Sequence, residues 1–169
     1  MAKYWVANNP NSEITNAQSQ ILKDIAAGSS TSAEIDIACN PSDGIEDVTA
    51  TNAITAAESG KTFFLNSATE FVSTLPAPAA GLNYTFIVKA APSGANYTVV
   101  TNGGADIMIG MVTCATADDL GQADANADVI TFVGGQSVVG DWVRVVSDGT
   151  SWYFSGACFV AEGITSGTT

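Results

Sequence analysis

The pattern of apolar and polar residues changes in character near residue 50. From about residue 51 onwards, short apolar stretches with a period of two recur at spacings of roughly ten residues, separated by glycine, proline and asparagine. Strands are predicted at Ile54–Ala57, Thr62–Asn66, Phe71–Leu75, Tyr84–Ala90, Tyr97–Thr101, Ile107–Thr113, Val129–Val133, Val138–Ser147, Ser151–Ser155 and near Cys158–Ala161. Because short strands joined by tight turns are typical of hairpins, the pattern predicts a mainly β fold, an antiparallel β-sandwich or barrel.

The residues before position 51 have a different pattern and are expected to form an N-terminal arm. Thr15 and Gln18 have the spacing of a capping box, and Gly28 stands where a helix would stop. These signals predict one short helix at about 16–27. The alternating stretch at 33–38 predicts a strand.

These patterns divide the chain into three parts. We expect the N-terminal arm at 1–50, a β core at 51–163 and a flexible tail at 164–169. A chain of 169 residues is long enough to bury about two-thirds of its surface, which supports one substantial core rather than two large domains.

The aromatic residues of the β core fall on predicted strands, so their expected role is packing inside the core. They are Phe63, Phe64, Phe71, Phe86, Phe132, Trp142, Trp152 and Phe154.

The net charge of the chain limits the kinds of molecule that it is expected to bind. The chain has 17 acidic and 5 basic side chains, no histidine and a net charge of −12. Nucleic acids and anionic membranes are bound by clustered cations, and here the cations are dispersed, at Lys3, Lys23, Lys61, Lys89 and Arg144. We therefore expect neither a nucleic-acid nor a membrane partner. No apolar stretch approaches the ~20 residues of a spanning helix, and the N-terminus lacks a signal-peptide core.

No pattern in the chain points to a catalytic or cofactor site. The absence of histidine excludes Ser-His-Asp and Cys-His catalysis. The run DANAD that starts at Asp124 begins like a calcium loop, but an EF-hand needs glycine and glutamate where this chain has Val129 and Gly135. We expect no enzyme activity, no cofactor and no metal site. Whether the acidic loop at 114–128 binds a cation stays open.

The three cysteines, Cys39, Cys114 and Cys158, cannot all pair within one chain. None stands in a CxxC arrangement, and small apolar residues flank all three. We expect buried free thiols, made in a reducing cytoplasm.

Several stretches of the β core resemble small structural proteins of tailed bacteriophages. They are Ile54–Asn66, Thr74–Gly81, Tyr84–Val88 and the hairpin Gly140–Tyr153, with the sequence GDWVRVVSDGTSWY. Across about residues 53–156 the chain looks most like capsid decoration (cement) proteins, which sit as β-rich trimers on icosahedral shells. A hairpin of the same pattern also recurs in phage tail and fibre modules.

The resemblance implies a structural virion protein without catalytic residues. It implies a homotrimer that binds the major capsid protein on the outer surface of the capsid, clamps neighbouring subunits and is made in the host cytoplasm. The alternative is a trimeric tail-fibre or receptor-binding module of a phage.

Tyr4, Trp5 and Val6 are the candidate intermolecular anchor of the N-terminal arm. Large aromatic side chains bury about 150–250 Å² each when they dock, and here they stand in a segment with few other large apolar groups. A contact with another chain and a contact with the chain's own core both remain open. We expect the arm to become ordered against a neighbouring chain on assembly.

Overall fold

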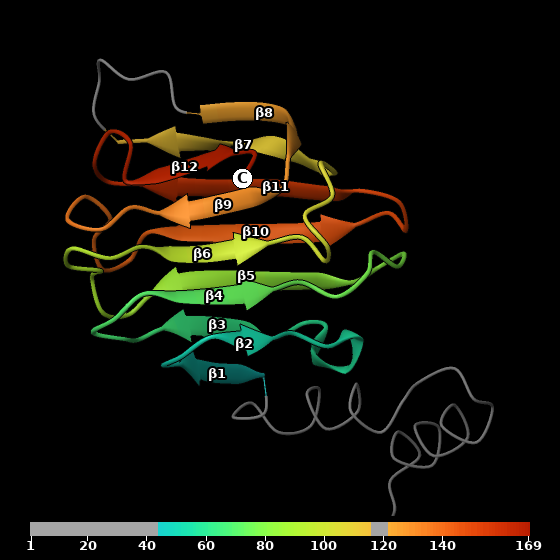
Figure 1. Ribbon diagram of the computed structural model, residues 1–169, viewed down its shortest axis with the longest axis horizontal. Coiled ribbons are helices and arrows are strands. Elements are labelled where there is room, and N and C mark those ends of the chain that lie inside the picture. Colours follow the sequence, from blue (N-terminus) through green and yellow to red (C-terminus); the bar gives the residue numbers. More distant parts are fainter. Residues whose placement is uncertain (1–43, 116–121) are drawn as a thin grey trace, which may run out of the picture.

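The computed structural model describes residues 44–115 and 122–169, and in these ranges the chain is mainly β (Figure 1). The strands are β1 (Ile45–Val48), β2 (Asn52–Ala53), β3 (Thr62–Leu65), β4 (Phe71–Thr74), β5 (Asn83–Val88), β6 (Tyr97–Val100), β7 (Met108–Cys114), β8 (Gln122–Ala127), β9 (Val129–Phe132), β10 (Trp142–Ser147), β11 (Trp152–Cys158) and β12 (Ile164–Gly167). In these ranges the one helix is a 3-10 turn, Ala56–Glu58. The described residues contain no helix long and apolar enough to cross a membrane. The helix expected at 16–27 and the strand expected at 33–38 lie outside these ranges.

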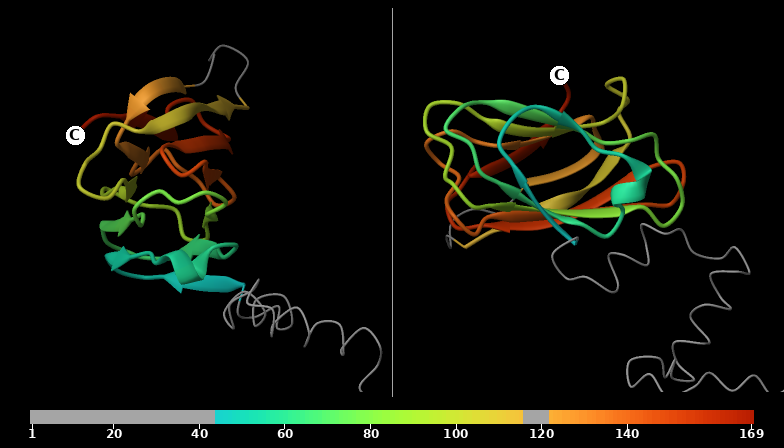
Figure 2. Two further views of the ribbon diagram at one scale, coloured as in Figure 1. Left: turned by 90° about the vertical axis from the view of Figure 1, so that its right-hand side faces the viewer. Right: turned by 90° about the horizontal axis from the view of Figure 1, so that it is seen from below.

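The strands form two sheets that stack face to face (Figure 2). The seven-stranded sheet has the order β1-β3-β5-β10-β11-β7-β8, and the five-stranded sheet has the order β12-β9-β6-β4-β2. The predicted mainly β class is confirmed, whereas the predicted purely antiparallel pairing is wrong. Both sheets are mixed: β1, β3 and β5 run parallel, as do β2, β4 and β6, and β7 runs parallel to β11.

The parallel pairing arises because the chain alternates between the two sheets along its first six strands. β1, β3 and β5 belong to the seven-stranded sheet, and the strands between them belong to the five-stranded sheet. Seen from below in Figure 2, this part of the chain winds as a flattened coil. A strand that is reached after a full turn of the coil runs in the same direction as the strand before it. The turns expected to close hairpins here carry the chain across to the other sheet.

The hairpin that the sequence marks most clearly is present at the centre of the seven-stranded sheet. β10 pairs antiparallel with β11, from Trp142 opposite Ala157 to Ser147 opposite Trp152. Gly149 has a φ of +104°, a conformation that side chains other than glycine's rarely adopt. β5 lies on one side of the hairpin and β7 on the other.

Every second residue of a strand points toward the opposite sheet, and these positions hold the large apolar side chains. The ring of Phe63 stacks on that of Phe86 with the centroids 5.4 Å apart, and Phe71 stacks on Tyr97 at 4.4 Å. Each stack joins equivalent positions on neighbouring parallel strands, so consecutive turns of the coil share one core. The largest fully buried side chains are Trp152, Tyr84, Tyr97, Phe63, Phe71, Phe86 and Phe132.

The ends of the β core differ from the expected boundaries. β1 begins at Ile45, so the core starts before residue 51. Residues 164–169 are not a flexible tail, because β12 pairs with β9 and Ile164 is fully buried. The buried carboxylate of Asp128 accepts hydrogen bonds from the backbone N–H and the hydroxyl of Thr169, at 2.9 and 2.7 Å. Part of the expected loop at 114–128 is also a strand, β8.

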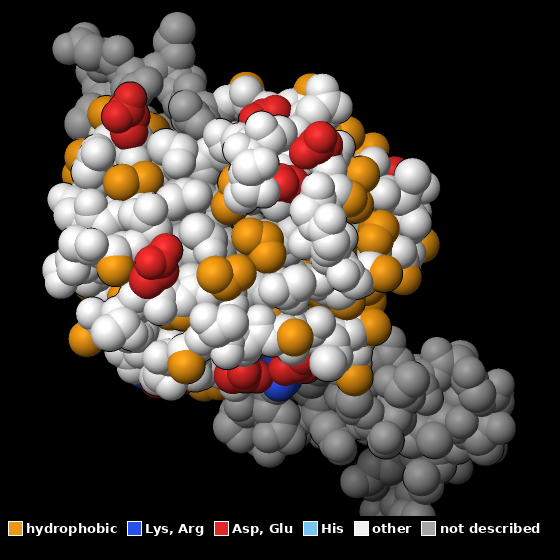
Figure 3. Space-filling model, viewed as in Figure 1, with side chains coloured by type: hydrophobic (Ala, Val, Ile, Leu, Met, Phe, Trp, Pro, Cys, Tyr) orange, Lys and Arg blue, Asp and Glu red, His pale blue; other side chains and the backbone are white. Residues whose placement is uncertain are grey.

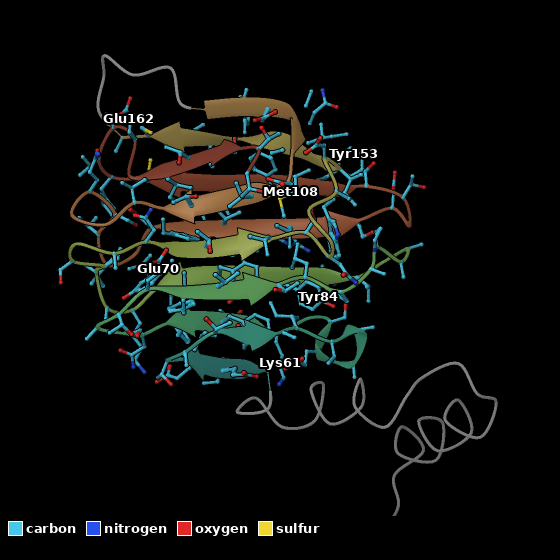
Figure 4. The ribbon with its side chains drawn as sticks, viewed as in Figure 1. Lys61, Glu70, Tyr84, Met108, Tyr153 and Glu162 are labelled. Carbon is cyan, nitrogen blue, oxygen red and sulfur yellow. The ribbon has the colours of Figure 1, made fainter. Side chains whose placement is uncertain are left out.

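Charged side chains lie at the edge of the seven-stranded sheet that β1 forms. Glu46 holds the register position that the buried Phe63 and Phe86 hold on the next two strands. The Lys61 Nζ atom lies 3.0 Å from a Glu46 carboxylate oxygen and 3.3 Å from one of Glu58. Figure 4 labels Lys61 at this lower edge, where Figure 3 shows basic atoms between acidic ones. A charge at an inward-facing position of an edge strand opposes pairing with a further strand.

The edge ion pairs shift the pKa values of their carboxyl groups. Burial alone would raise the pKa of Glu58, but hydrogen bonds from Thr55 and the Lys61 ammonium outweigh it and lower that pKa. The hydrogen bond from Lys89 lowers the pKa of Asp47. Since both folded-state pKa values lie below the unfolded values, these groups contribute stability at neutral pH that is lost as the pH falls below about 4.

We expect Phe63→Ala to lower the free energy of unfolding by about 3–5 kcal/mol, because it opens a cavity in the core. Phe64→Ala is the matched control. Its ring is half-buried on the outer side of the same strand, and its removal is expected to cost about 1 kcal/mol. Urea denaturation followed by circular dichroism measures both. Equal losses would contradict the register of β3, because a shift of one residue exchanges the two positions.

We expect Lys61→Met to weaken the acid dependence of stability, because the pKa of Glu58 then moves back toward its ordinary value. The free energy of unfolding of the unmodified chain should fall more steeply between about pH 5 and pH 3 than that of the variant. Arg144→Met is the control, since Arg144 forms no ion pair with any described residue. Parallel curves for Lys61→Met and the unmodified chain would argue against the edge cluster.

Candidate interaction surface

The outward face of the seven-stranded sheet carries large apolar side chains. Exposed and buried residues alternate along β10, and its outward positions hold Trp142, Arg144 and Val146. Tyr153 of β11 pairs with Val146, and Met111 of β7 is 51% exposed. We call this surface the outer apolar face; it consists of Phe64, Ile87, Met111, Trp142, Val146 and Tyr153.

The register arranges most of these side chains in two apolar rows, separated by a row that holds Thr85, Arg144 and Ser155. Trp142 pairs with Ile87 of β5, and Ile87 pairs with Phe64 of β3. With neighbouring strands about 4.8 Å apart, the five strands from β3 to β7 span about 19 Å. Phe64 and Trp142 were expected in the core and instead point outward, so the core prediction is wrong for these two aromatic residues.

Charged side chains are few within the outer apolar face and gather at its rim, where the Lys89 ammonium lies 5.9 Å from the centre of the Phe64 ring and the Tyr153 hydroxyl donates a hydrogen bond to Asp148. Among the outward residues of β3, β5, β10, β11 and β7, Arg144 is the one charged side chain. Tyrosine, tryptophan, methionine and arginine are enriched at the centres of protein interfaces, whereas lysine, aspartate and glutamate are depleted there. The residue types of this face are therefore those of an interaction surface.

A pocket of about 190 Å³ extends the apolar surface at one end of this face. It is lined by Ala115, Gly140, Trp142, Ala157, Cys158 and Phe159. The Phe159 side chain is 58% exposed beside it. A side chain in place of Gly140 would lie 3.4 Å from the Phe159 ring and would need a φ of +98°. Glycine is therefore the residue that fits this rim.

A buried carboxylate holds the two loops around this pocket. Asp141 is 0% exposed, and its oxygens accept hydrogen bonds from the Ser137 hydroxyl at 2.8 Å and the backbone N–H of Val138 at 2.9 Å. A third hydrogen bond comes from the backbone N–H of Phe159, also at 2.9 Å. Because Asp141 directly precedes Trp142, one side chain fixes both aromatic groups of the pocket. The sequence offered no signal for this role, since an aspartate after glycine is typical of an exposed turn.

The outward face of the five-stranded sheet has a different composition. Its paired positions on β4, β6, β9 and β12 hold Val72, Thr98, Thr131 and Thr165, all of them half-buried. None of the exposed large hydrophobic residues of the described chain lies on this face. It presents small groups, without the aromatic side chains of the outer apolar face.

The expected anchor residues Tyr4, Trp5 and Val6 lie outside the described residues. Their role stays a prediction, and the structure does not bring them together with the outer apolar face. Cys39 lies outside as well, whereas Cys114 is half-buried and Cys158 is buried.

Two aspartates of the expected acidic loop are described. The Asp124 carboxylate accepts a hydrogen bond from the backbone N–H of Asn126 at 3.0 Å, and Asp128 binds the C-terminal Thr169. Within residues 44–115 and 122–169, no three acidic or cysteine side chains are grouped so as to hold a metal ion.

The fold and this surface define a mainly β chain with a candidate protein-binding face. Comparisons with protein-family models, curated proteins and solved structures find no match to the chain. Its function is therefore argued from its own residues.

We expect Asp141→Ala to lower the free energy of unfolding by about 2–3 kcal/mol, because it leaves buried donors without an acceptor. Asp148→Ala is the control: its carboxylate accepts backbone hydrogen bonds in the exposed β10–β11 turn, and a smaller loss is expected. Thermal and urea unfolding measure both variants. A loss for Asp141→Ala no larger than that for Asp148→Ala would rule out the buried network as the support of the pocket.

Proposed function

We propose that the chain is a structural protein of a bacteriophage virion that decorates and stabilises an icosahedral capsid. It acts by binding rather than by catalysis: as a homotrimer on the outer surface of the capsid, it clamps neighbouring major capsid subunits after synthesis in the host cytoplasm. The resemblance across residues 53–156 supports the class of protein, and the outer apolar face supplies a means of attachment.

The outer apolar face is the observation that carries the proposal. The chain has a net charge of −12, and burying unpaired carboxylates in a contact is costly, so attachment to the shell favours a face with few of them. The centre of the outer apolar face meets that condition, because Arg144 is the one charged side chain among the outward residues of the five strands from β3 to β7. Two carboxylates, Asp47 and Asp148, lie at its rim. Tryptophan, tyrosine and arginine are also the residue types that dominate binding energy at interfaces.

The apolar surface that the outer apolar face can bury is large enough to contribute to attachment. Trp142 and Tyr153 are 38% and 46% exposed. Together they would lose about 200 Å² of accessible surface on docking, worth about 5 kcal/mol before the cost of association. A trimer that binds through three such faces gains further from multivalency, and a ligand that binds the assembled shell stabilises it.

The alternative function is a trimeric tail-fibre or receptor-binding module of a phage. The winding of β1 to β6 favours it, because parallel turns of this kind extend by stacking further turns. The charges of Glu46 and Lys61 at the β1 edge oppose such stacking. We therefore prefer the capsid assignment.

The test compares two variants that add a charge to opposite faces. Trp142→Glu lies on the outer apolar face, and Thr131→Glu lies on the outward face of the five-stranded sheet. We expect Trp142→Glu to weaken binding to empty shells of the cognate major capsid protein at least tenfold, measured by co-sedimentation. Thr131→Glu should bind like the unmodified chain, and shells carrying bound protein should melt at a higher temperature than bare shells.

Equal binding by both variants would remove the outer apolar face from the mechanism. Absence of shell binding by the unmodified chain, together with binding to tail preparations, would replace the capsid assignment by the fibre alternative.

A further inference from the structure

Two of the three cysteines are brought together by the fold. Cys114 ends β7 and Cys158 ends β11, and the two residues are direct partners in the parallel pairing of these strands. Their side chains lie on the inward side of the sheet, with the Sγ atoms 2.7 Å apart. Both thiols are free, as expected, with Cys158 buried and Cys114 half-buried, but they lie in contact with each other.

We propose that Cys114 and Cys158 are a disulfide-forming pair that links β7 to β11 when the chain meets a disulfide oxidant. Neighbouring strands lie about 4.8 Å apart, inside the range of about 4.4–6.8 Å between the Cα atoms of disulfide-bonded residues. The bond forms between residues that already face each other, so it requires no rearrangement of the sheet. This inference is independent of the proposed function.

The different exposure of the two cysteines determines which of them reacts first with an oxidant. Cys114 is half-buried and is the last residue of its strand, whereas Cys158 is buried and lines the pocket beside Trp142. A small disulfide such as oxidised glutathione therefore reaches Cys114 first. The third cysteine, Cys39, does not pair with either residue in this proposal.

The oxidation proceeds by two exchanges. The Cys114 thiolate attacks one sulfur of oxidised glutathione, forms a mixed disulfide and releases one glutathione thiolate, which takes up a proton. The Cys158 thiolate then attacks the Cys114 sulfur and releases the second glutathione thiolate, which is protonated in turn. The two cysteines lose two electrons and two protons, and one oxidised glutathione becomes two reduced molecules.

The second exchange is expected to be the slow one. Burial, with a smaller contribution from the neighbouring Cys114, raises the pKa of Cys158 to about 12. Few Cys158 thiolates are then present at pH 7, and the rate of bond closure should rise about tenfold per pH unit between pH 7 and pH 9.

The bond would connect residues that are 44 positions apart and would enclose β8, β9, β10 and β11 up to Cys158. A crosslink over a segment of this length restricts the unfolded chain, and the melting temperature should rise by roughly 5–15 °C. The strand that it fixes, β7, carries Met111 of the outer apolar face.

The positions of lysine and arginine make a direct test possible. Trypsin cuts after Lys23, Lys61, Lys89 and Arg144, so Cys39, Cys114 and Cys158 fall into the separate peptides 24–61, 90–144 and 145–169. The reduced full chain is incubated with oxidised glutathione at about pH 9, where closure of the bond is expected to be fast. It is then alkylated under denaturing conditions and digested without reductant. We expect peptide 90–144 joined to 145–169, and the two peptides apart after reduction. Alkylated Cys114 and Cys158, a stable glutathione adduct at Cys114, or a link to peptide 24–61 would overturn the proposal.

Cysteine variants give a second readout. Cys39→Ser keeps the pair, and its oxidised form should melt about 5–15 °C above its reduced form. Cys39→Ser combined with Cys114→Ser should melt at one temperature in both conditions. Equal melting temperatures for oxidised and reduced Cys39→Ser would contradict a stabilising bond.

Discussion

The rest of the molecule depends on one kind of contact: the packing of inward side chains between neighbouring parallel strands, which belong to consecutive turns of the coil. Phe63 stacks on Phe86 in one sheet, and Phe71 stacks on Tyr97 in the other. Each stack fixes the register of two parallel strands, because a shift of one residue would turn every inward side chain outward. The outer apolar face follows from the same constraint: once Val143 and Val145 occupy the core, Trp142 and Val146 must face outward.

Much of the secondary structure was predictable, but the topology was not. Period-two stretches and turn residues located most of the strands, since both signals are local. These local signals indicate where a strand ends, but they do not indicate which sheet the next strand joins. The predicted strands between residues 54 and 101 therefore looked like a series of hairpins, although this part of the chain winds between the sheets. β8 has the polar sequence QADANA and β12 has one large apolar residue, Ile164, so neither carried a strand signal.

The candidate surface was hidden for a related reason. Both alternating sets of β10 are largely apolar, so the period alone could not tell which set is buried. Trp142 was assigned to the core because aromatic residues are generally buried. Its partner across the hairpin, Ala157, occupies an outward-facing position of β11, so Trp142 faces outward as well. Asp141 and the pairing of Cys114 with Cys158 depend on contacts between distant segments, which one sequence cannot reveal. The anchor expected at Tyr4, Trp5 and Val6 lies outside the described residues and stays a prediction.

The central claim is that the outer apolar face becomes buried on assembly, and hydroxyl-radical footprinting of side chains tests it most directly. Met111, Trp142 and Tyr153 are exposed and belong to the side-chain types that such radicals oxidise fastest, while the buried Met108 and Trp152 serve as internal references. The account predicts that oxidation of the three exposed residues falls when the protein is bound to capsid shells, with the references low in both states. Unchanged oxidation of all three, with new protection of Tyr4 and Trp5, would contradict the account and assign attachment to the N-terminal arm.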